Sequence, residues 1–225
     1  ADGKIAFCIN YGNLAQESGL GVGDKFVLYM QDKGGYADDF EALDVTRTDN
    51  RADYSDDAAF ANFREVTFNS AIMPRTLYRG SHPTKTRWPR APYASALMEK
   101  AGIVTVINMS DSEEQLKNTY LAASNQYASA YYGKLTDAGN VLCLAMDMDF
   151  TGKAFTDNII KALQFMISHK APYYIHCNEG KDRTGFIFIL LGALSGADEK
   201  AIYGDYMKSY ENFYHLAAGS RKYDL

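Results

Sequence analysis

The sequence predicts an α/β domain in which a central, mostly parallel sheet is flanked by helices, and a small β-rich subdomain that precedes it. Two observations support the α/β domain. Beyond about residue 75, apolar and β-branched runs of strand length alternate with longer segments of helical periodicity. The runs are almost continuously apolar, which is typical of parallel strands buried on both faces. The expected strands are TLYRG (76–80), IVTVIN (103–108), VLCLAM (141–146) and APYYIHC (171–177).

Four segments between and after these strands have helical patterns. YASALMEKAG ends at Gly102, where a glycine commonly terminates a helix. AFTDNIIKALQFMISHK repeats apolar residues every three or four positions, so they share one face. GFIFILLGALSG is apolar throughout, as in a buried helix, and DEKAIYGDYMKSYENFYHL is amphipathic. This alternation with strands places helices on both faces of the sheet.

The domain boundary is expected near residue 52. Residues 1–52 are predicted to form the β-rich N-terminal subdomain, and residues 53–225 the α/β domain. Short runs of β-type residues separated by glycine-rich turns support the first of these predictions. These runs are IAFCIN (5–10), KFVLYM (25–30) and FEALDVTR (40–47).

Composition and charge narrow the classes of function. The net charge of -5 and the pI of about 5.4 argue against a nucleic-acid partner. No run approaches the ~18 apolar residues that a membrane span needs. Cys8, Cys143 and Cys177 are too few and too scattered for a disulfide framework. Because the sequence begins at Ala1, two localisations stay open: secreted or extracytoplasmic if a signal peptide was removed, and cytoplasmic otherwise.

The stretch YYIHCNEGKDRTGF (173–186) contains the candidate functional residues. An expected strand leads to Cys177, five residues separate it from Arg183, and an apolar helix follows. A loop of this length between strand and helix can wrap backbone N–H groups around phosphoryl oxygens. The planar guanidinium of Arg183 can bind two of these oxygens. The expected phosphate-binding residues are Asn178, Glu179, Gly180, Lys181, Asp182 and Arg183.

Cys177 is the candidate nucleophile. Just before a helix N-terminus, the helix dipole and free N–H groups can lower the pKa of a thiol from about 8.5 to roughly 3.5–7.5. The thiolate would attack phosphorus and form a phosphocysteine that water later cleaves. Thr184 can donate its hydroxyl to the sulfur when the sulfur leaves. His176 is expected to orient the loop by hydrogen bonding, because an ionised thiol needs no base.

HCNEGKDRTG resembles the HCxxGxxR[ST]G signature loop of the protein tyrosine and dual-specificity phosphatase superfamily. Its GKDRTG ending is similar to a bacterial branch that hydrolyses phosphotyrosine and, in some members, phosphoinositides. LYRGSHP (77–83) and VINMSDSEE (106–114) resemble further segments of that branch. The resemblance extends over about residues 66–216. It implies the cysteine-based phosphatase fold, the nucleophile Cys177, phosphate binding by the loop and Arg183, and no metal or other cofactor.

The resemblance also implies a general acid, usually an aspartate on a mobile loop about thirty residues before the nucleophile. Asp147 and Asp149 lie 30 and 28 positions before Cys177. Asp149 is preferred, because the glycine-containing turn that follows it can let the loop close. Asp182 is the third candidate, since the similar loop of myotubularin lipid phosphatases is thought to use its aspartate in this way. Asp111 is the next candidate for the general acid. The sequence departs from the animal tyrosine phosphatases, because it lacks their Trp-Pro-Asp tripeptide.

Basic residues near the expected site have two interpretations each. Lys181 either binds a second phosphate of the substrate, which would favour inositol lipids, or is a solvated lysine that balances neighbouring carboxylates. Lys85, Arg87 and Arg90 either form a basic rim for an anionic substrate or are simply solvated. Arg79 is expected to form a structural ion pair.

The leading hypothesis is phosphomonoester hydrolysis by a protein tyrosine phosphatase-like enzyme. The expected partners are phosphorylated proteins, through phosphotyrosine or also phosphoserine and phosphothreonine, or phosphoinositides. A sulfurtransferase or arsenate reductase is an alternative that uses a similar loop, although Thr184 and the GKD tripeptide favour the phosphatase. A catalytically inactive phosphate-binding module is another. Cys177 and Arg183 argue against it, because a pure binder needs no nucleophile.

Overall fold

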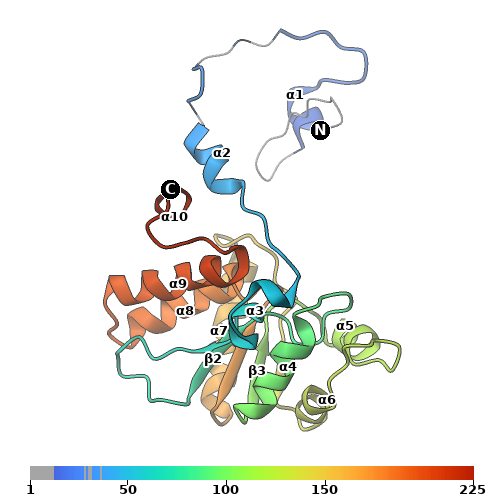
Figure 1. Ribbon diagram of the computed structural model, residues 1–225. Coiled ribbons are helices and arrows are strands. Elements are labelled where there is room, and N and C mark those ends of the chain that lie inside the picture. Colours follow the sequence, from blue (N-terminus) through green and yellow to red (C-terminus); the bar gives the residue numbers. More distant parts are fainter. Residues whose placement is uncertain (1–12, 28, 30–31, 36) are drawn as a thin grey trace. The chain divides into compact units, whose positions relative to one another are not determined.

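The chain divides into two compact units, Ala1–Asp38 and Asp39–Leu225, which are described separately. The computed structural model, drawn as a ribbon in Figure 1, describes part of the first unit and all of the second unit's backbone. The described residues are 13–27, 29, 32–35 and 37–225.

The described residues between 13 and 50 form helices and turns but no strand. Helix α1 spans Leu14–Ser18, and the Asn13 side chain caps it by accepting a hydrogen bond from the Gln16 N–H. Helix α2 spans Ala37–Leu43, so the strand predicted over 40–47 is wrong in its first half. The segment contains alanine, glutamate and leucine, which are strong helix formers. The prediction gave more weight to the glycine-rich turns that precede it. The predicted strand 5–10 lies outside the described residues.

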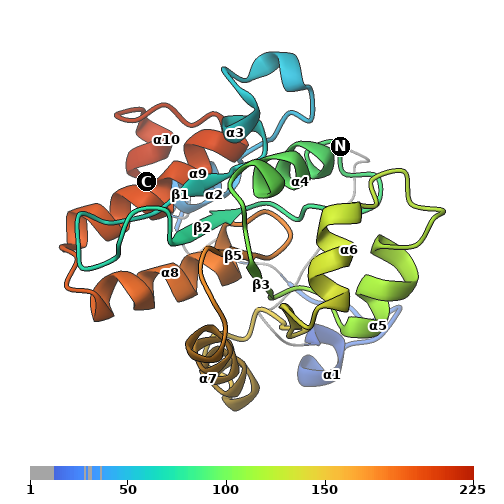
Figure 2. The ribbon, with the colours of Figure 1, turned by 90° about the horizontal axis from the view of Figure 1, so that it is seen from below.

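The second unit is built on a five-stranded sheet with the order β1-β2-β5-β3-β4 (Figure 2). The strands are β1 (Arg64–Glu65), β2 (Leu77–Gly80), β3 (Thr105–Asn108), β4 (Val141–Cys143) and β5 (Tyr173–His176). β1 pairs with β2 in the antiparallel direction, whereas β2, β5, β3 and β4 are parallel neighbours. The structure therefore confirms the predicted mostly parallel sheet, with β5 at its centre.

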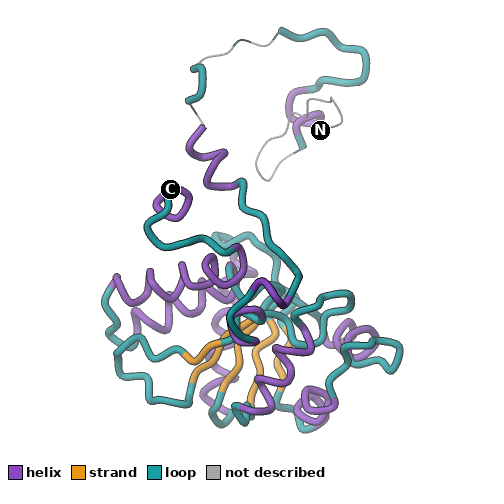
Figure 3. Tube along the Cα trace, in the orientation of Figure 1, coloured by secondary structure: helices purple, strands orange, loops and turns teal. Residues whose placement is uncertain are grey.

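Helices cover both faces of this sheet (Figures 1, 2 and 3). Besides α2, the helices of the second unit are η1 (Arg51–Asp53), α3 (Asp57–Phe60), α4 (Ala91–Lys100), α5 (Glu113–Gln115), the π-helical turn η2 (Leu116–Tyr120), α6 (Ala130–Asp137), α7 (Lys153–Ser168), α8 (Asp182–Leu194), α9 (Glu199–Tyr214) and α10 (Arg221–Asp224). α4 and α6 lie on one face of the sheet, and α7 and α8 on the other (Figure 2). α9 packs against α8 and α3.

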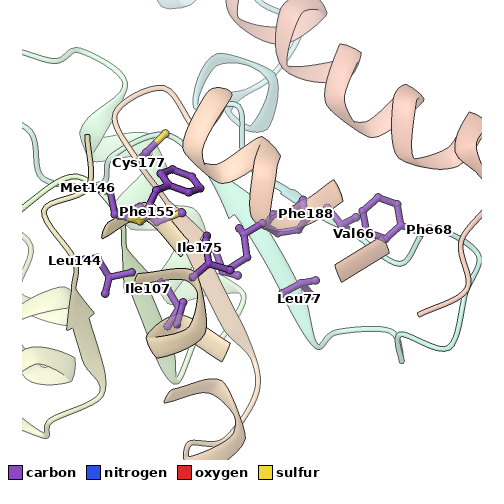
Figure 4. Close-up of a cluster of buried hydrophobic side chains, with 14 residues drawn as sticks. Val66, Phe68, Leu77, Ile107, Leu144, Met146, Phe155, Ile175, Cys177 and Phe188 are labelled. Atoms are coloured by element: carbon purple, nitrogen blue, oxygen red, sulfur yellow. The ribbon is translucent and has the colours of Figure 1, made fainter. Parts of the chain in front are cut away.

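Side chains of the strands alternate between two hydrophobic clusters, because successive strand residues face opposite sides of a sheet. Ile107 and Ile175 belong to the cluster on the α7 and α8 side (Figure 4). Val106 and Tyr174 belong to the cluster on the α4 and α6 side. All four side chains are fully buried. Cys177 lies at one end of the first cluster (Figure 4), so the core extends to the end of the central strand.

The carboxyl ends of the four parallel strands lie at the same edge of the sheet. The register pairs His176 of β5 with Gly80 of β2 on one side and with Asn108 of β3 on the other. Asn108 in turn pairs with Cys143 of β4. The four segments that follow these strands therefore leave the sheet together. In open α/β sheets this edge is where ligands bind.

Candidate active site

Cys177 follows the central strand β5 directly and lies where the carboxyl ends of the strands meet. It is a free cysteine and only 3 % exposed. After it the chain bends through Lys181 and enters α8 at Asp182, with Thr184 and Gly185 buried in the first turn. The first-turn N–H groups of a helix have no partner within that helix and favour a bound anion. The structure thus places the nucleophile candidate between a buried strand and the N-terminus of a thirteen-residue helix.

Gly180 lets the loop pack directly against strand β2. Its φ angle is +73°, a value that other residues rarely adopt. A Cβ atom at Gly180 would lie 2.2 Å from the carbonyl oxygen of Gly80, the last residue of β2. At Gly80 itself, a Cβ atom would lie 2.6 Å from the hydroxyl oxygen of Tyr174. The close approach of loop and strand thus requires a glycine at 180, whereas the glycine at 80 leaves room for the Tyr174 hydroxyl.

Arg79, on β2, determines which way two peptide groups of the loop face. Its Nη2 donates hydrogen bonds to the carbonyl oxygens of Gly180 at 2.8 Å and Lys181 at 3.3 Å. Its Nη1 forms an ion pair with Asp205 of α9, which confirms the predicted structural role. In a trans peptide the N–H points away from the C=O. The N–H groups of Lys181 and Asp182 therefore face away from Arg79.

Arg183 and Thr184 each have a buried polar atom that finds no hydrogen-bond partner in the described part of the chain. Nη1 of Arg183 donates a hydrogen bond to the carbonyl oxygen of Met146 at 2.7 Å, which fixes the guanidinium at one end. Its Nε and the Thr184 hydroxyl are buried and have no hydrogen-bond partner among the described residues. Since buried polar groups in proteins are nearly always hydrogen-bonded, these two groups have donor capacity for an anion in the loop.

His176, the residue before Cys177, is fully buried and neutral. Its Nδ1 lies 3.1 Å from the carbonyl oxygen of Cys177, which can only accept, so Nδ1 carries the proton. Its Nε2, 3.0 Å from the Tyr132 hydroxyl, then accepts a hydrogen bond. Burial and, next, the nearby His82 lower the pKa of His176 to about 3. This geometry suits a residue that orients the loop, not a base.

His82 and Asp111 connect the segments after β2 and β3 to the loop. Nε2 of His82 lies 2.6 Å from Oδ2 of Asp111, and Nδ1 of His82 accepts from the Thr84 N–H. Burial works against the ionised carboxyl, but hydrogen bonds from His82 and Asn108 hold the pKa of Asp111 below its usual range. The backbone N–H of His82 donates to the carbonyl oxygen of Asn178 at 2.9 Å. Asp111 is therefore a buried, ionised partner of His82, which does not suit a general acid.

Asp147 and Asp149 lie together on an exposed turn beside the loop. Oδ1 of Asp147 accepts from the backbone N–H of Asp149, and Oδ1 of Asp149 accepts from the Thr151 hydroxyl, both at 3.0 Å. The bond between Arg183 and the Met146 carbonyl joins this turn to the Cys177 loop. The structure thus connects the turn of both acid candidates to the guanidinium through the Met146 carbonyl, while each carboxylate accepts a hydrogen bond from its own turn.

Lys181 extends toward α9 and is enclosed by that helix. Its Nζ lies 3.1 Å from the Tyr214 hydroxyl, and 3.7 Å from carboxylate oxygens of both Glu179 and Asp182. The ammonium also lies over the rings of Tyr210 and Tyr214, at 4.9 and 4.7 Å from their centroids. The interpretation as a charge-balancing lysine is the one that fits, although the side chain is largely buried and not solvated.

Asp182, the third acid candidate, differs from an ordinary aspartate. Burial is the largest influence on its pKa and raises it, and the neighbouring Glu179 raises it too. The positive charges of Lys181 and Arg183 oppose this shift without cancelling it. Asp182 therefore keeps its proton to a higher pH than usual, which is a property that a general acid needs.

The three basic residues of the loop before α4 have three different environments. Nζ of half-buried Lys85 donates to the Asn178 side-chain oxygen at 2.6 Å. Arg87 is exposed. Arg90 is fully buried, and its Nη2 donates to the carbonyl oxygen of Thr48 at 2.6 Å. Of the predicted basic rim, only Lys85 contacts the Cys177 loop, and Arg90 has a structural role.

Sequence reasoning missed several side chains that hold the loop. Arg47, placed in a predicted strand, forms an ion pair with Glu179 at 3.4 Å. Asp205 and Tyr214 of α9 bind Arg79 and Lys181. A signal for α9 was present, because Tyr206, Tyr210 and Tyr214 follow one another at intervals of four and such residues share one helix face. Arg47 has no comparable signal.

The remaining features concern metals, membranes and the second described cysteine. Among the described residues, no group of three or more His, Cys, Asp or Glu side chains is placed to hold a metal ion. Within the same ranges, no helix is long and apolar enough to cross a membrane. Burial raises the pKa of Cys143 to about 12, so this thiol is a poor nucleophile.

The chain is similar in sequence or fold to known phosphatases. The sequence model of a tyrosine phosphatase family matches residues 58–223. The core catalytic domain of the PP-IP phosphatase SIW14 from S. cerevisiae, in complex with citrate, is 19% identical with a TM-score of 0.43, over 72% of this chain and 81% of that chain. TpbA from P. aeruginosa is 19% identical with a TM-score of 0.38, over 66% and 78%. A search of curated proteins finds no match.

Replacing Gly180 with alanine should disrupt the loop. The Cβ atom would collide with the Gly80 carbonyl, and the positive φ adds strain, so we expect a loss of about 1–3 kcal/mol in the free energy of unfolding. Binding of inorganic phosphate, measured by calorimetry, should disappear. The control is Gly133→Ala in α6, where a Cβ meets nothing within 4 Å and helix propensity improves. Equal phosphate binding by Gly180→Ala and the control would contradict this account of the loop.

The buried neutral His176 should make the protein acid-labile. Its folded pKa of about 3 lies below the ordinary value of 6.5, so the unfolded chain takes up a proton that the folded protein does not. The stabilisation is complete above pH ~6.5 and is lost as the pH falls from there toward about 3, by about 2 kcal/mol at pH ~5. Urea unfolding above pH ~6.5 and at pH ~5 should show a smaller drop in the free energy of unfolding for His176→Asn than for the wild type. An unchanged drop would mean that His176 is not the group concerned.

Proposed function

Because this chain belongs to the tyrosine phosphatase family, we propose that it hydrolyses phosphate monoesters through a phosphocysteine intermediate on Cys177. One observation carries the proposal. Cys177 lies at the end of the central strand, and the loop after it is held by Arg79 so that two N–H groups face the other way. The loop ends at Arg183, whose guanidinium keeps an unpartnered Nε. A thiol, amides that face away from Arg79 and a guanidinium in one loop are the components that phosphoryl transfer needs.

In the first step, Sγ of Cys177 attacks phosphorus in line with the leaving oxygen. The S–P bond forms while the P–O bond breaks, and the electron pair of that bond goes to the leaving oxygen, which takes a proton from the general acid. The loop N–H groups and the Arg183 guanidinium stabilise the charge on the three remaining oxygens. The Met146 carbonyl holds one end of that guanidinium, so its position is set before substrate binds.

In the second step, water attacks the phosphocysteine and the S–P bond breaks. The electron pair of that bond returns to the sulfur, and inorganic phosphate is the product. The acid of the first step, now a carboxylate, takes the proton of the water. The Thr184 hydroxyl, buried and without a partner among the described residues, is proposed to donate a hydrogen bond to the leaving thiolate.

Asp149 is our proposed general acid, with Asp147 and Asp182 as the alternatives. The exposed turn of Asp149 is joined to the loop through the Met146 carbonyl and Arg183, so a small movement of this turn brings its carboxylate to the leaving group. The raised pKa of Asp182 is an argument for Asp182 instead, because a general acid must hold its proton. An acid at Asp149 and an acid at Asp182 predict different variants to be impaired, so kinetic measurements on the variants separate them.

Phosphotyrosine is the proposed substrate, with phosphoserine, phosphothreonine and phosphoinositides as further ones. The family match supports phosphate esters over the sulfur or arsenate chemistry that a similar loop also serves. The buried nucleophile and the unpartnered Thr184 hydroxyl support turnover over mere phosphate binding. Purified protein, assayed with phosphotyrosine peptides beside phosphoinositides, tests the substrate class directly.

Replacing Cys177 with serine should abolish turnover and preserve binding. A serine hydroxyl stays protonated at neutral pH and is a far weaker nucleophile than a thiolate, while the loop keeps its shape. Release of phosphate from 4-nitrophenyl phosphate should fall below the detection limit. Cys143→Ser is the matched control and should stay active, because that thiol lies outside the site. A Cys177→Ser enzyme with more than a few per cent of wild-type kcat would refute the proposed nucleophile.

The general acid can be assigned from the leaving group. A poor leaving oxygen depends more on protonation, so loss of the acid should impair phosphotyrosine more than activated aryl esters, and alkyl esters most. For Asp149→Ala we expect a loss on the order of 10²–10⁴ in kcat on phosphotyrosine. The measurement compares kcat of Asp147→Ala, Asp149→Ala and Asp182→Ala on 4-nitrophenyl phosphate, phosphotyrosine and glycerol phosphate. A steeper dependence in Asp182→Ala than in Asp149→Ala would overturn our preference.

A further inference from the structure

Asn62 contacts the Cys177 loop from outside it and takes no part in the two chemical steps. Its side chain is fully buried, although the residue lies just after the short helix α3 and not in the sheet. The side-chain Nδ2 donates a hydrogen bond to the carbonyl oxygen of Glu179 at 3.0 Å. Glu179 is the second residue after Cys177, so a side chain from a distant segment holds a peptide group of the loop.

The end of α3 explains the backbone conformation of Asn62 but not its side chain. Its φ angle is +50°, its N–H donates to the Ala59 carbonyl at 3.1 Å, and the Phe63 N–H donates to the Ala58 carbonyl at 2.8 Å. This left-handed helix end is most often made by glycine, and asparagine is the next choice. Glycine would end the helix as well, so the contacts of the Asn62 amide need a separate explanation.

The orientation of the Asn62 amide follows from its neighbours. Its Oδ1 accepts hydrogen bonds from Nη1 of Arg64 at 2.7 Å and from Nδ2 of Asn212 at 3.3 Å. Burial, and next the charge of Arg79, lowers the pKa of Arg64 to about 10, so its guanidinium is still protonated at neutral pH and can only donate. The Glu179 carbonyl can only accept. Oδ1 therefore faces Arg64, and Nδ2 faces the loop.

The contact completes a set of donors to the loop carbonyls. Every carbonyl from Cys177 to Lys181 accepts a hydrogen bond from a group outside this stretch: His176 Nδ1 binds that of Cys177, the His82 N–H that of Asn178, Asn62 Nδ2 that of Glu179, and Arg79 Nη2 those of Gly180 and Lys181. These peptide bonds are trans, so each N–H points away from its carbonyl. The N–H groups of residues 178–182 therefore point away from the donors, as a nest for an anion requires.

Asn62 and Arg79 belong to one buried network on one side of the loop. Arg64, which holds the Asn62 amide, donates through Nε to Oδ1 of Asp205 at 2.7 Å. Asp205 is also the ion-pair partner of Arg79. The donors to three successive carbonyls, those of residues 179–181, are thus joined to one another, and the N–H groups of the same peptides face the opposite side.

We propose that Asn62 is a positioning residue for phosphate binding, which fixes the peptide between Glu179 and Gly180 so that the Gly180 N–H faces a phosphoryl oxygen. It touches no substrate and acts through the loop. Glycine and aspartate tolerate the left-handed backbone as well, but glycine has no side chain and ionised aspartate has no donor. Asparagine meets both requirements, that of the helix end and that of the loop. The kinetic consequence rests on the proposed function, whereas the effect on phosphate binding does not.

Two substitutions remove the donor in different ways. Asn62→Asp keeps the left-handed backbone and the acceptor for Arg64 but turns an oxygen toward the Glu179 carbonyl. Asn62→Gly keeps the helix end, where glycine is usual, and removes the amide without adding a charge. The matched control is Asn69→Asp, because Asn69 has a φ angle of +53° and is exposed.

The binding test uses the Cys177→Ser protein and inorganic phosphate, with calorimetry as the measurement. We expect the Kd to weaken about tenfold or more in both Asn62 variants, since hydrogen bonds to charged groups are the strong ones. Asn69→Asp should keep the original Kd. Thermal melting gives the temperature range in which each variant is folded, and the Kd is measured within it.

The kinetic test uses the active enzyme and separates a positioning role from loss of the general acid. A misplaced donor should lower kcat/KM for 4-nitrophenyl phosphate by on the order of 10² in both Asn62 variants. The loop amides bind the transferred phosphoryl group and not the leaving oxygen. The ratio of kcat for 4-nitrophenyl phosphate to kcat for phosphotyrosine should therefore stay as in the wild type, whereas loss of the acid would change it.

Two outcomes would overturn the inference. If both Asn62 variants keep the phosphate Kd of the Cys177→Ser parent, the asparagine serves the helix end and does not position the loop. If Asn62→Asp is impaired but Asn62→Gly is not, the added charge is the cause and the lost donor is not. Failure of the proposed function would look different, because the wild type would then hydrolyse no phosphate ester. The calorimetric comparison would still decide the role of Asn62.

Discussion

The interaction on which the site depends is the contact of buried Arg79 with the Cys177 loop. A fully buried guanidinium is costly to desolvate, and Asp205, the Gly180 and Lys181 carbonyls and the Phe188 ring, 4.7 Å from its centre, together offset that cost. Arg79 lies on β2, Asp205 on α9 and the carbonyls in the loop. One charge thus fixes strand, helix and loop together, and it orients peptide groups as an anion site needs.

The sequence was informative wherever a local pattern determines the structure. The apolar runs predicted all four parallel strands, and the spacing from Cys177 to Arg183 predicted a loop between strand and helix. Gly180 was predicted as a residue of the phosphate-binding loop, and the constraint that the structure adds is the Gly80 carbonyl, about 100 residues away in sequence. Such a contact depends on the register of two strands. No pattern within either segment contains that information.

Charged side chains were harder to place, because their partners are chosen by tertiary structure. The sequence left two roles open for Lys181, a substrate contact or charge balance, and two tyrosines and two carboxylates hold it against α9. Arg90 was expected to lie in a basic rim or in solvent, yet it is buried. Lys85 and Arg47 were indistinguishable from solvated residues in sequence. A lysine's long stem lets its ammonium reach any of several neighbours, so position along the chain sets its site poorly.

The site also depends on residues that precede the family match at residue 58. Arg90 is fully buried, and its Nη2 donates to the Thr48 carbonyl, while its Nε lies 3.3 Å from Asp49. A buried guanidinium needs such acceptors, so this segment is part of the fold and not an appendage. Arg47, next to these residues, reaches Glu179 and the Trp88 ring from there. The same short stretch therefore supplies acceptors to the buried Arg90 and a cation that contacts the Cys177 loop.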